Sequence, residues 1–355
     1  MKVRAYITHK PSEYYSDCQD RFCINKTNRT LAVSDGMSQS IFPEYWAEIL
    51  STQYAETGHC TEEDRKSLCE SWMKKVECYL HEQETQGKNP WRLRNNIAAR
   101  SGAGATICGI KFANAENWVG HVLGDSCIIE ISRIDWKAKI LSSEEKAFDS
   151  HPDYYDCFPE KKGSGEIKQF EGYLDKDKIL LLVSDPFSEY FDKHKDNCKD
   201  LVEQILCLES HENFCKLVDE WRSKGMHKDD STMCIIEFDG ENELNIQIQD
   251  DIQKLIEKEN NEIIKSKELP TILENSTPPE EKTCNDNKDN SILHKYHEFV
   301  MKNIGDIIQE NIANNRRKQS KLSRKQLRYS HSDNVIKALE SLKDNIIRFF
   351  NQLIQ

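Results

Sequence analysis

Five short acidic motifs occur in a fixed order within residues 1–240, and each contains at least one aspartate. Several follow an apolar stretch with the composition of a β-strand: TLAV, WVGHVL and KILLLV precede three of the motifs. A carboxylate at the end of a strand is held on a rigid support while its head group reaches outward. Several such groups that meet in one place form the hard, oxygen-rich site that Mg²⁺ or Mn²⁺ prefers. The motifs are CQD at 18–20, SDG at 34–36, GDS at 124–126, SDP at 184–186 and KDDST at 228–232.

The chemistry that suits such a site is hydrolysis of a phosphate monoester. Two divalent ions held close together bind the phosphate oxygens and ionise a bridging water. The site then needs one carboxylate shared by both ions and further carboxylates that hold each ion. Asp35 suits the shared position, because the following residue, Gly36, lets a backbone carbonyl approach a metal. We expect Asp20, Asp185 and Asp229 to complete the pair of ion sites.

The order and spacing of these motifs resemble those of the metal-dependent protein phosphatase 2C family of serine/threonine phosphatases. The resemblance covers residues 1 to about 240. Each motif alone is weak, because Asp-Gly, for example, is usually a turn, but the order of the whole set is specific. The matching residues are Gln19-Asp20, Asp35-Gly36, SGAGAT at 101–106, GDS at 124–126, Ser184-Asp185 and Asp229-Asp230-Ser231-Thr232.

The resemblance implies an α+β fold, in which a central antiparallel β-sandwich is flanked by helix pairs and holds its metals in a cleft at one end. It implies a protein serine/threonine phosphatase, a phosphoric monoester hydrolase that acts on phosphoserine and phosphothreonine through a water activated by two metal ions. The expected ions are Mn²⁺ or Mg²⁺. A phosphoprotein substrate is the implied partner, and a serine/threonine kinase is a further candidate.

The resemblance also assigns roles to individual residues. Asp35 would bridge the two ions and Asp20 would orient a metal-bound water, so these two aspartates are the predicted catalytic residues. A third, weaker ion is implied at Asp125, Asp185 and Glu189. The complete set of predicted metal ligands is Asp35, Gly36, Asp185, Asp229, Asp125 and Glu189.

Among the departures from the family pattern, two bear most on the function. Pro186 replaces the glycine that usually follows the second-metal aspartate, and proline fixes φ and removes an N–H group. The phosphate-binding arginine is absent, and Tyr15 stands near its place. A second interpretation therefore stays open: a weakly active or inactive phosphatase-like binding module that recognises a phosphoprotein or a kinase through the same cleft. Candidate substitutes for the arginine are Arg4, Lys10 and Arg21.

The elements that must position these residues are strands with two inserted helices. The helices are expected at 43–50 and 61–80, and the polar stretch 142–172 is expected to be a loop and a candidate flap beside the site. Strands before and after the helices, with no regular βαβ alternation, predict a layered antiparallel α+β fold. The expected strands are 4–9, 21–24, 30–33, 105–111, 117–123, 127–131, 179–183 and 233–238.

The composition changes after residue 242. We expect a phosphatase-like domain at 1–242, a polar linker at 243–290 with one helix near 252–264, and a helical appendage at 291–355. The appendage contains two amphipathic stretches joined by the basic run RRKQSKLSRKQLR, which predicts a helical hairpin with a basic connector. Its helices could pack on each other, on the catalytic domain or on a protein partner. The basic run is either a solvated surface, a docking site for an acidic partner or a nucleic-acid contact.

The overall composition narrows the remaining classes. A net charge of -12 over 355 residues argues against general nucleic-acid binding. The 13 cysteines form no CxxC pair, and neither a signal peptide nor a long apolar run is visible, so we expect reduced thiols, no membrane span and a cytoplasmic protein. No cysteine is expected to be a nucleophile, because no Cys/His arrangement is visible. His227, two residues before Asp229, is interpreted as a polar-loop residue first and a cleft residue second.

Overall fold

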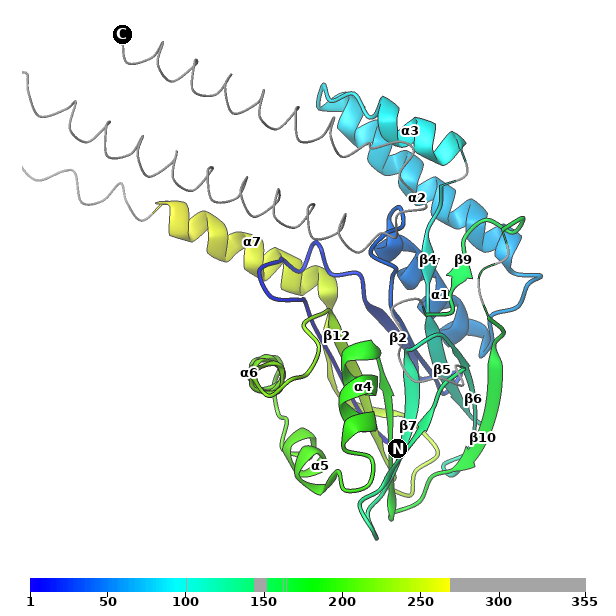
Figure 1. Ribbon diagram of the computed structural model, residues 1–355, viewed down its shortest axis with the longest axis vertical. Helices are drawn as coiled ribbons and strands as arrows, with labels where there is room; N and C mark the ends of the chain where they lie inside the picture. The colour runs from blue at the N-terminus through cyan, green and yellow to red at the C-terminus, as the bar shows by residue number, and fades with distance from the viewer. Residues whose placement is uncertain (100, 144–151, 162, 164, 269–355) are drawn as a thin grey trace, which may run out of the picture. The chain divides into compact units, whose positions relative to one another are not determined.

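The computed structural model describes residues 1–268, apart from 100, 144–151, 162 and 164 (Figure 1). The described residues all belong to one compact unit, Met1–Ile272. The helical appendage expected at 291–355 and the linker from residue 269 onward lie outside the described residues, as does part of the expected loop at 142–172.

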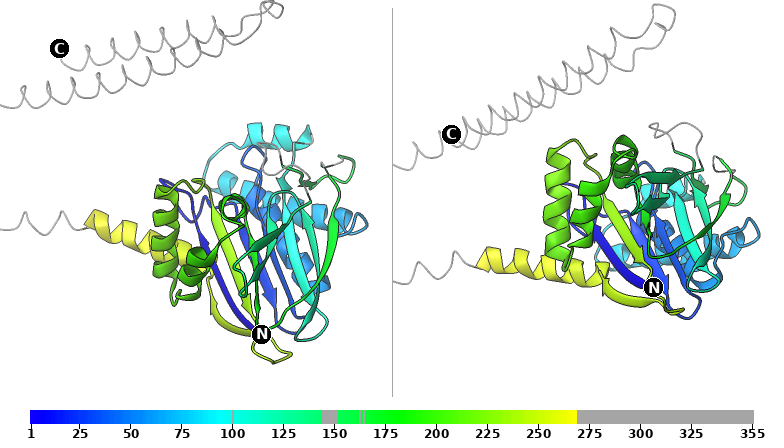
Figure 2. Two further views of the ribbon diagram at one scale, coloured as in Figure 1. Left: turned by 60° about the horizontal axis from the view of Figure 1, so that its bottom comes forward. Right: turned by 90° about the horizontal axis from the view of Figure 1, so that it is seen from below.

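The strands form two large sheets that lie face to face (Figure 2). Neighbouring strands in these sheets are antiparallel, except that β1 and β13 run parallel. One sheet has the order β13 (Asn245–Gln249), β1 (Lys2–Thr8), β12 (Ser231–Glu237), β11 (Lys178–Val183), β7 (Cys127–Ser132) and β8 (Ala138–Leu141). The other has the order β10 (Lys168–Tyr173), β6 (Asn117–Leu123), β5 (Ile107–Phe112), β3 (Thr30–Ser34) and β2 (Arg21–Asn25), and β4 (Gly104–Ala105) pairs with β9 (Tyr155–Asp156).

The apolar run of β11 shows how a strand of the sandwich contributes to two cores, one on each face of its sheet. Side chains of a strand alternate between the two faces of its sheet. Leu180 and Leu182 pack in the core between the two sheets, whereas Leu181 and Val183 pack in a second core under helices. Because both faces of β11 are covered, the strand is apolar at every position from residue 179 to 183.

Helices cover the outer face of each sheet (Figures 1 and 2). Trp46 of α1 (Pro43–Thr57) and Trp72 of α2 (Arg65–Thr85) pack in a core against the five-stranded sheet, where α3 (Trp91–Ala98) contributes Ile97. Phe187 and Trp221 pack in the core between the six-stranded sheet and the helices on its outer face. The helices on that side are α4 (Asp185–Lys193), α5 (Lys199–Leu206) and α6 (His211–Ser223), and α7 (Ile252–Glu268) follows β13.

This architecture confirms the predicted α+β fold with a central antiparallel β-sandwich between helices. The expected strands and the two expected helices are present, with ends that differ by a few residues from those predicted. The helix expected near 252–264 is α7, but strand β13 precedes it and was not predicted. Strand β8 was not predicted either, and the loop expected at 142–172 is wrong in part, because β9 and most of β10 lie within it. Among the described residues, no helix combines the length and the apolar composition needed to cross a membrane.

Candidate metal centre

The topology brings the five acidic motifs to one end of the sandwich. Asp20 precedes β2, Asp35 follows β3, Asp125 lies between β6 and β7, Asp185 follows β11, and Asp229 lies just before β12. In antiparallel pairs the end of one strand lies beside the start of its neighbour. The end of β11 pairs with the starts of β7 and β12, and the end of β3 pairs with the starts of β2 and β5.

Asp35 lies at the middle of this set. Its side chain is partly buried. Burial, and then the negative charges of Asp20, Asp185, Asp125 and Asp229, raise the pKa of Asp35 well above its usual value. Four other carboxylates therefore lie within its electrostatic reach. Such a group of like charges is unfavourable unless protons or cations neutralise it.

Asp20 is the most buried of these carboxylates. Its exposed fraction is 0%, and neither carboxylate oxygen accepts a hydrogen bond. Burial and the neighbouring charge of Asp230 raise the pKa of Asp20 to about 8, although the nearby hydroxyls of Ser184 and Thr232 favour its ionised form. Buried polar atoms almost always have a partner, so the two free oxygens indicate a place for metal-bound water or an ion.

Three potential metal ligands lie close together at the end of the sandwich where the acidic motifs meet. Ligand atoms of Asp185, His227 and Asp229 all lie within 4.8 Å of one another. His227 Nδ1 lies 3.7 Å from Asp185 Oδ2, and this contact raises the pKa of His227. Asp35 is not part of this trio within the described residues. The histidine had been interpreted first as a polar-loop residue; its position two residues before Asp229 was the signal for its place here.

Asp125 and Glu189 flank the trio from two elements. Glu189 lies one helical turn after Asp185 on α4 and 3.6 Å from Lys193 Nζ. Burial, and then the charges of Asp229 and Glu189, raise the pKa of Asp185, while His227 opposes them. Asp125 is buried in the turn between β6 and β7. Glu189 is therefore near Asp185, with which a third ion is predicted, whereas the charge of Asp125 acts on Asp35.

Hydroxyl groups join three of the motifs. Thr106 of the SGAGAT motif shares a hydrogen bond of 2.6 Å with Ser126 of the GDS motif. Ser34 of the SDG motif donates to the Thr106 carbonyl at 2.6 Å, and the Asp35 N–H donates to the Thr106 hydroxyl at 3.3 Å. These contacts fix the backbone on both sides of the carboxylates that the motifs carry.

Two glycines are required where the site elements approach each other. A Cβ on Gly36 would lie 2.7 Å from the Cβ of Pro43, at the start of α1. Gly124 has φ of 91°, and a Cβ there would lie 2.5 Å from the carbonyl oxygen of Asp153. Glycine at these positions allows the close contacts behind Asp35 and Asp125.

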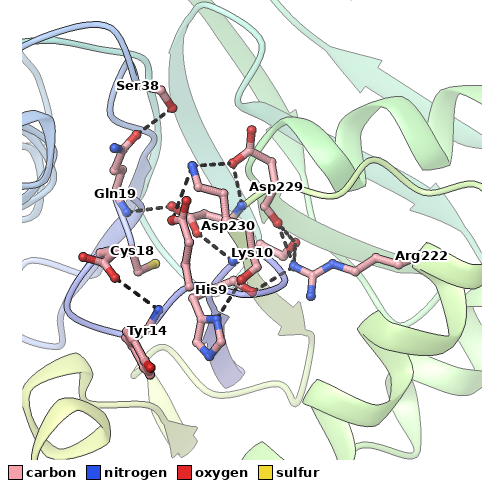
Figure 3. A network of polar contacts seen from close by, with 12 residues as sticks. His9, Lys10, Tyr14, Cys18, Gln19, Ser38, Arg222, Asp229 and Asp230 are labelled. Carbon is pink, nitrogen blue, oxygen red and sulfur yellow. Dashed lines mark hydrogen bonds and ion pairs between the residues drawn. The ribbon is translucent and has the colours of Figure 1, made fainter. Parts of the chain in front are cut away.

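Asp230 anchors the segment that follows β1 (Figure 3). One of its carboxylate oxygens accepts the N–H of Lys10 at 2.9 Å, and the other accepts the N–H of Gln19 at 2.7 Å. Arg222 donates to the carbonyls of Asp229 and His9, at 2.7 and 3.0 Å. The start of β12 and residues 9–19 are therefore held together beside Asp20.

Lys10 places a cation in the site. Its Nζ lies 3.3 Å from Asp229 Oδ1, and the charges of Asp229 and Asp230 outweigh burial and raise its pKa. Arg21 donates to two backbone carbonyls near Asp20, each at 2.7 Å. Arg4 is buried and donates to the Leu208 carbonyl at 2.9 Å. Of the three candidate substitutes for the missing arginine, Lys10 is the one whose side chain contacts a predicted metal ligand.

Pro186 lies in the first turn of α4. The first N–H groups of a helix have no partner inside it, so a proline there removes no hydrogen bond. Asp185 is the first residue of the helix and Ser184 is its N-cap. A carboxylate at a helix N-terminus is favoured by the helix dipole. The proline is therefore compatible with the helix that begins at Asp185 and leaves the Asp185 carboxylate in the site.

Comparisons with known proteins give the following likenesses. No protein-family model matches the chain, and no curated protein sequence matches it. Serine/threonine phosphatase Stp1 from Staphylococcus aureus is similar in structure, with 16% identity and a TM-score of 0.42 over 67% of this chain and 95% of that one. The Mycobacterium tuberculosis serine/threonine phosphatase PstP/Ppp has 14% identity and a TM-score of 0.39 over 66% of this chain and 96% of that one. Inference about activity therefore comes from the chain's own residues.

Proposed function

We propose that the protein is a metal-dependent protein serine/threonine phosphatase that hydrolyses phosphoserine and phosphothreonine with the help of two Mn²⁺ or Mg²⁺ ions. The observation that carries this proposal is the convergence of five ordered acidic motifs around Asp35. Hard cations prefer such carboxylate oxygens. The residues fit these ions, since Asp20 offers two buried oxygens without a hydrogen bond and three further ligand atoms lie within 4.8 Å of one another.

The roles of the residues follow from their positions. When bound, the ions would supply Lewis acidity to the phosphate and lower the pKa of a shared water. Asp35 would contact both ions because other carboxylates surround it, and Gly36 would offer its carbonyl. Asp185 and Asp229, joined here by His227, would hold the second ion.

Two further residues act on water and phosphate. The buried oxygens of Asp20 would accept hydrogen bonds from the water that attacks phosphorus, which orients it in line with the leaving serine or threonine oxygen. Lys10, whose Nζ is 3.3 Å from Asp229, would attract the phosphate dianion. Asp125, whose charge acts on Asp35, and Glu189, whose charge acts on Asp185, are the proposed ligands of a third ion together with Asp185. A phosphoprotein is the proposed substrate.

The test is hydrolysis of p-nitrophenyl phosphate and of a phosphothreonine peptide, with and without Mn²⁺. We expect Asp35→Asn to lower kcat/KM at least about a hundredfold, because an ion-bridging group is lost. The same change should raise the melting temperature of the metal-free protein, because it removes a carboxylate from a group of like charges. Full activity of Asp35→Asn would disprove the proposal.

A matched variant controls for the loss of any aspartate. Asp135 lies in the turn between β7 and β8, and its side chain is 51% exposed. Asp135→Asn should leave metal-dependent turnover unchanged, because Asp135 lies outside the candidate metal centre. If it lowers turnover as much as Asp35→Asn does, the effect is one of net charge and not of the site.

A phosphoprotein-binding module is the second candidate function. The observation that favours it is the ion pair between Lys10 and Asp229, which neutralises a predicted ligand without a metal, together with the missing arginine. Metal analysis separates the two functions, because a binding module has no need of two ions. Two bound equivalents of Mn²⁺ with turnover would exclude the binding module, and neither metal nor turnover would favour it.

A further inference from the structure

A second cluster of titratable side chains lies outside the candidate metal centre, between α6, the end of β1 and the start of α7. His211 and Cys215 lie one turn apart on α6, so they face the same side of the helix. His211 Nε2 is 3.3 Å from Cys215 Sγ, and His211 Nδ1 is 2.8 Å from Asp250 Oδ2. The expectation that the chain has no Cys/His arrangement is therefore wrong, and the sequence HENFC at 211–215 contains it.

The sulfur of Cys215 is surrounded by groups that can donate hydrogen bonds. Besides His211, the hydroxyls of Thr8 and Tyr15 each lie 3.6 Å from Sγ. Tyr15 also shares a hydrogen bond of 2.8 Å with His211 Nε2. As a thiol, Cys215 donates to the Thr8 hydroxyl. In the thiolate form the Thr8 and Tyr15 hydroxyls can turn to donate to the sulfur, while the Nε2–H of His211 is shared between the sulfur and Tyr15. Such donors stabilise a thiolate relative to a thiol.

Asp250 fixes the imidazole in the orientation that this arrangement needs. Its Oδ2 accepts the N–H of Ile7 at 2.9 Å and contacts His211 Nδ1, and its side chain is 6% exposed. Burial lowers the pKa of His211, but the hydrogen bonds and charges of Asp250 and Cys215 together outweigh it and raise the pKa to about 10. Burial alone would raise the pKa of Cys215, but the hydrogen bond and charge of His211 lower it.

We propose that Cys215 is a modification site: a nucleophilic thiolate, held by His211, Tyr15 and Thr8, that reacts with hydroperoxides and with soft electrophiles. The residue is partly exposed and is not enclosed in a core of the sandwich. Other cysteines differ in their surroundings. Cys108 and Cys234 are buried, and burial raises the pKa of both thiols, which makes them unreactive. Cys78 and Cys207 are exposed and serve as reference thiols.

The reaction with hydrogen peroxide is balanced by the groups present. The thiolate sulfur attacks one oxygen, an S–O bond forms and the O–O bond breaks. The departing hydroxide takes the proton from Nε2 of the His211 imidazolium and leaves as water. Sulfur is oxidised by two electrons to a sulfenic acid, and the peroxide is reduced by two.

Modification of Cys215 would also affect the candidate metal centre, through the segment that contains Tyr15. Tyr15 contacts the sulfur and belongs to the segment, residues 9–20, that carries Lys10, Gln19 and Asp20 to that centre. An added oxygen occupies the space between Cys215 and Tyr15. We expect it to displace this segment and to lower turnover. This consequence rests on the proposed function, whereas the reactivity of the thiol does not.

The first test is alkylation of the full-length protein by iodoacetamide between pH 6.5 and 8.5, followed at each cysteine by mass spectrometry. For an ordinary thiol with a pKa near 8.5, the alkylation rate should fall about fiftyfold from pH 8.5 to pH 6.5. We expect the rates at Cys78 and Cys207 to do so, and the rate at Cys215 to fall clearly less than theirs, because its pKa is lowered. The charged and titratable groups that face this cluster are His9, Tyr15, His211, Glu212, Asp250, Lys258 and Glu259.

Variants identify the cause of that profile. His211→Gln should give Cys215 the pH dependence of the reference thiols, whereas Tyr15→Phe, which keeps the ring, should change it only partly. Thermal unfolding checks that each variant folds. If a variant does not fold, the pH profile of Cys215 in the unsubstituted protein decides the test. The proposal is overturned if Cys215 in that protein follows the profile of Cys78 and Cys207, or is not alkylated while they are.

The second test is treatment with hydrogen peroxide in the presence of dimedone, which traps sulfenic acids. We expect a dimedone adduct at Cys215 in the full-length protein, and its absence would overturn the proposal. Mn²⁺-dependent turnover should fall on oxidation in the unsubstituted protein and in Cys207→Ser, but not in Cys215→Ser. If turnover is absent from the start, the proposed phosphatase fails while the adduct still reports on Cys215.

Discussion

Asp20 is a fully buried carboxylate whose surroundings favour a neutralising proton or cation. Its pKa of about 8 stands against a usual value of 3.8, so the folded protein without metal binds a proton here that the unfolded chain releases. The stability that this proton confers is complete below the usual value and is lost as the pH rises toward 8. Mn²⁺ would replace the proton as the neutralising charge.

We therefore predict that the melting temperature of the metal-free protein falls as the pH rises from 5 to about 8, and that Mn²⁺ flattens this dependence. Thermal unfolding in a chelator and in Mn²⁺ measures both. Asp20→Asn serves as the control, because it should remove a large part of the slope. A metal-free protein whose stability rises over this range would contradict the pKa direction of Asp20.

His227 is predicted to bind the second ion with Asp185 and Asp229, since the three ligand atoms lie within 4.8 Å. His227→Ala should weaken Mn²⁺ binding about 10- to 100-fold, the usual effect of losing a group that binds or orients a metal. Isothermal titration of Mn²⁺ into the metal-free variant measures this loss. His59→Ala is the control, since His59 is exposed and contacts Asp64 instead. Unchanged Mn²⁺ binding would leave His227 as a partner of Asp185 alone.

Single residues differ in how far the sequence predicts their place. Asp35 and Asp185 could be found because each follows an apolar strand in a recognisable motif. Lys10 and His227 lie in polar segments whose course depends on contacts distant in sequence, such as that between Lys10 and Asp230, 220 residues away. Local composition does not encode such contacts, so these residues stayed candidates until the fold placed them.

At the scale of elements, the start of α4 shows how a motif residue can change while its neighbour keeps its place. Pro186 is buried in the first helical turn. We predict that Pro186→Gly leaves Mn²⁺-dependent turnover within about twofold, because Asp185 stays at the helix start. It should lower stability by about 1 kcal/mol, because glycine gives the unfolded chain more freedom. Urea unfolding and turnover assays measure the two effects, and a large gain in turnover would show that the proline restrains the site.

Strands with two covered faces were predictable, whereas three of the four edge strands, β8, β10 and β13, were not. β11 reads KILLLV because both its faces are buried, a pattern that indicates a strand directly. β13 reads NIQIQ, with exposed and partly buried residues in alternation, and lies at the sheet edge beside β1. Its place depends on β1 at the other end of the sequence. A short alternating run of this kind does not stand out in a polar stretch.

At the scale of the whole molecule, residues beyond 242 contact both the N-terminus and the segment beside the metal centre. β13 pairs with β1, and the Met1 amine donates to the Glu243 carbonyl at 2.8 Å. Glu259 on α7 accepts the N–H of Tyr15 at 2.9 Å. These contacts connect the polar stretch after residue 242 to the sandwich and to residues 9–20.

Two truncations test where the catalytic unit ends. A chain that stops after residue 268 keeps β13, α7 and their contacts, so we predict that its melting temperature and Mn²⁺-dependent turnover match those of the full chain. A chain that stops after residue 242 exposes the edge of β1 and loses the hydrogen bonds that Asp250 and Glu259 accept from Ile7 and Tyr15. Hydrogen bonds to charged groups contribute about 1.5–3 kcal/mol each, which corresponds to a fall of about 10 °C or more in melting temperature. Equal stability of the two truncations would instead place the end of the domain at residue 242, as the change in composition predicts.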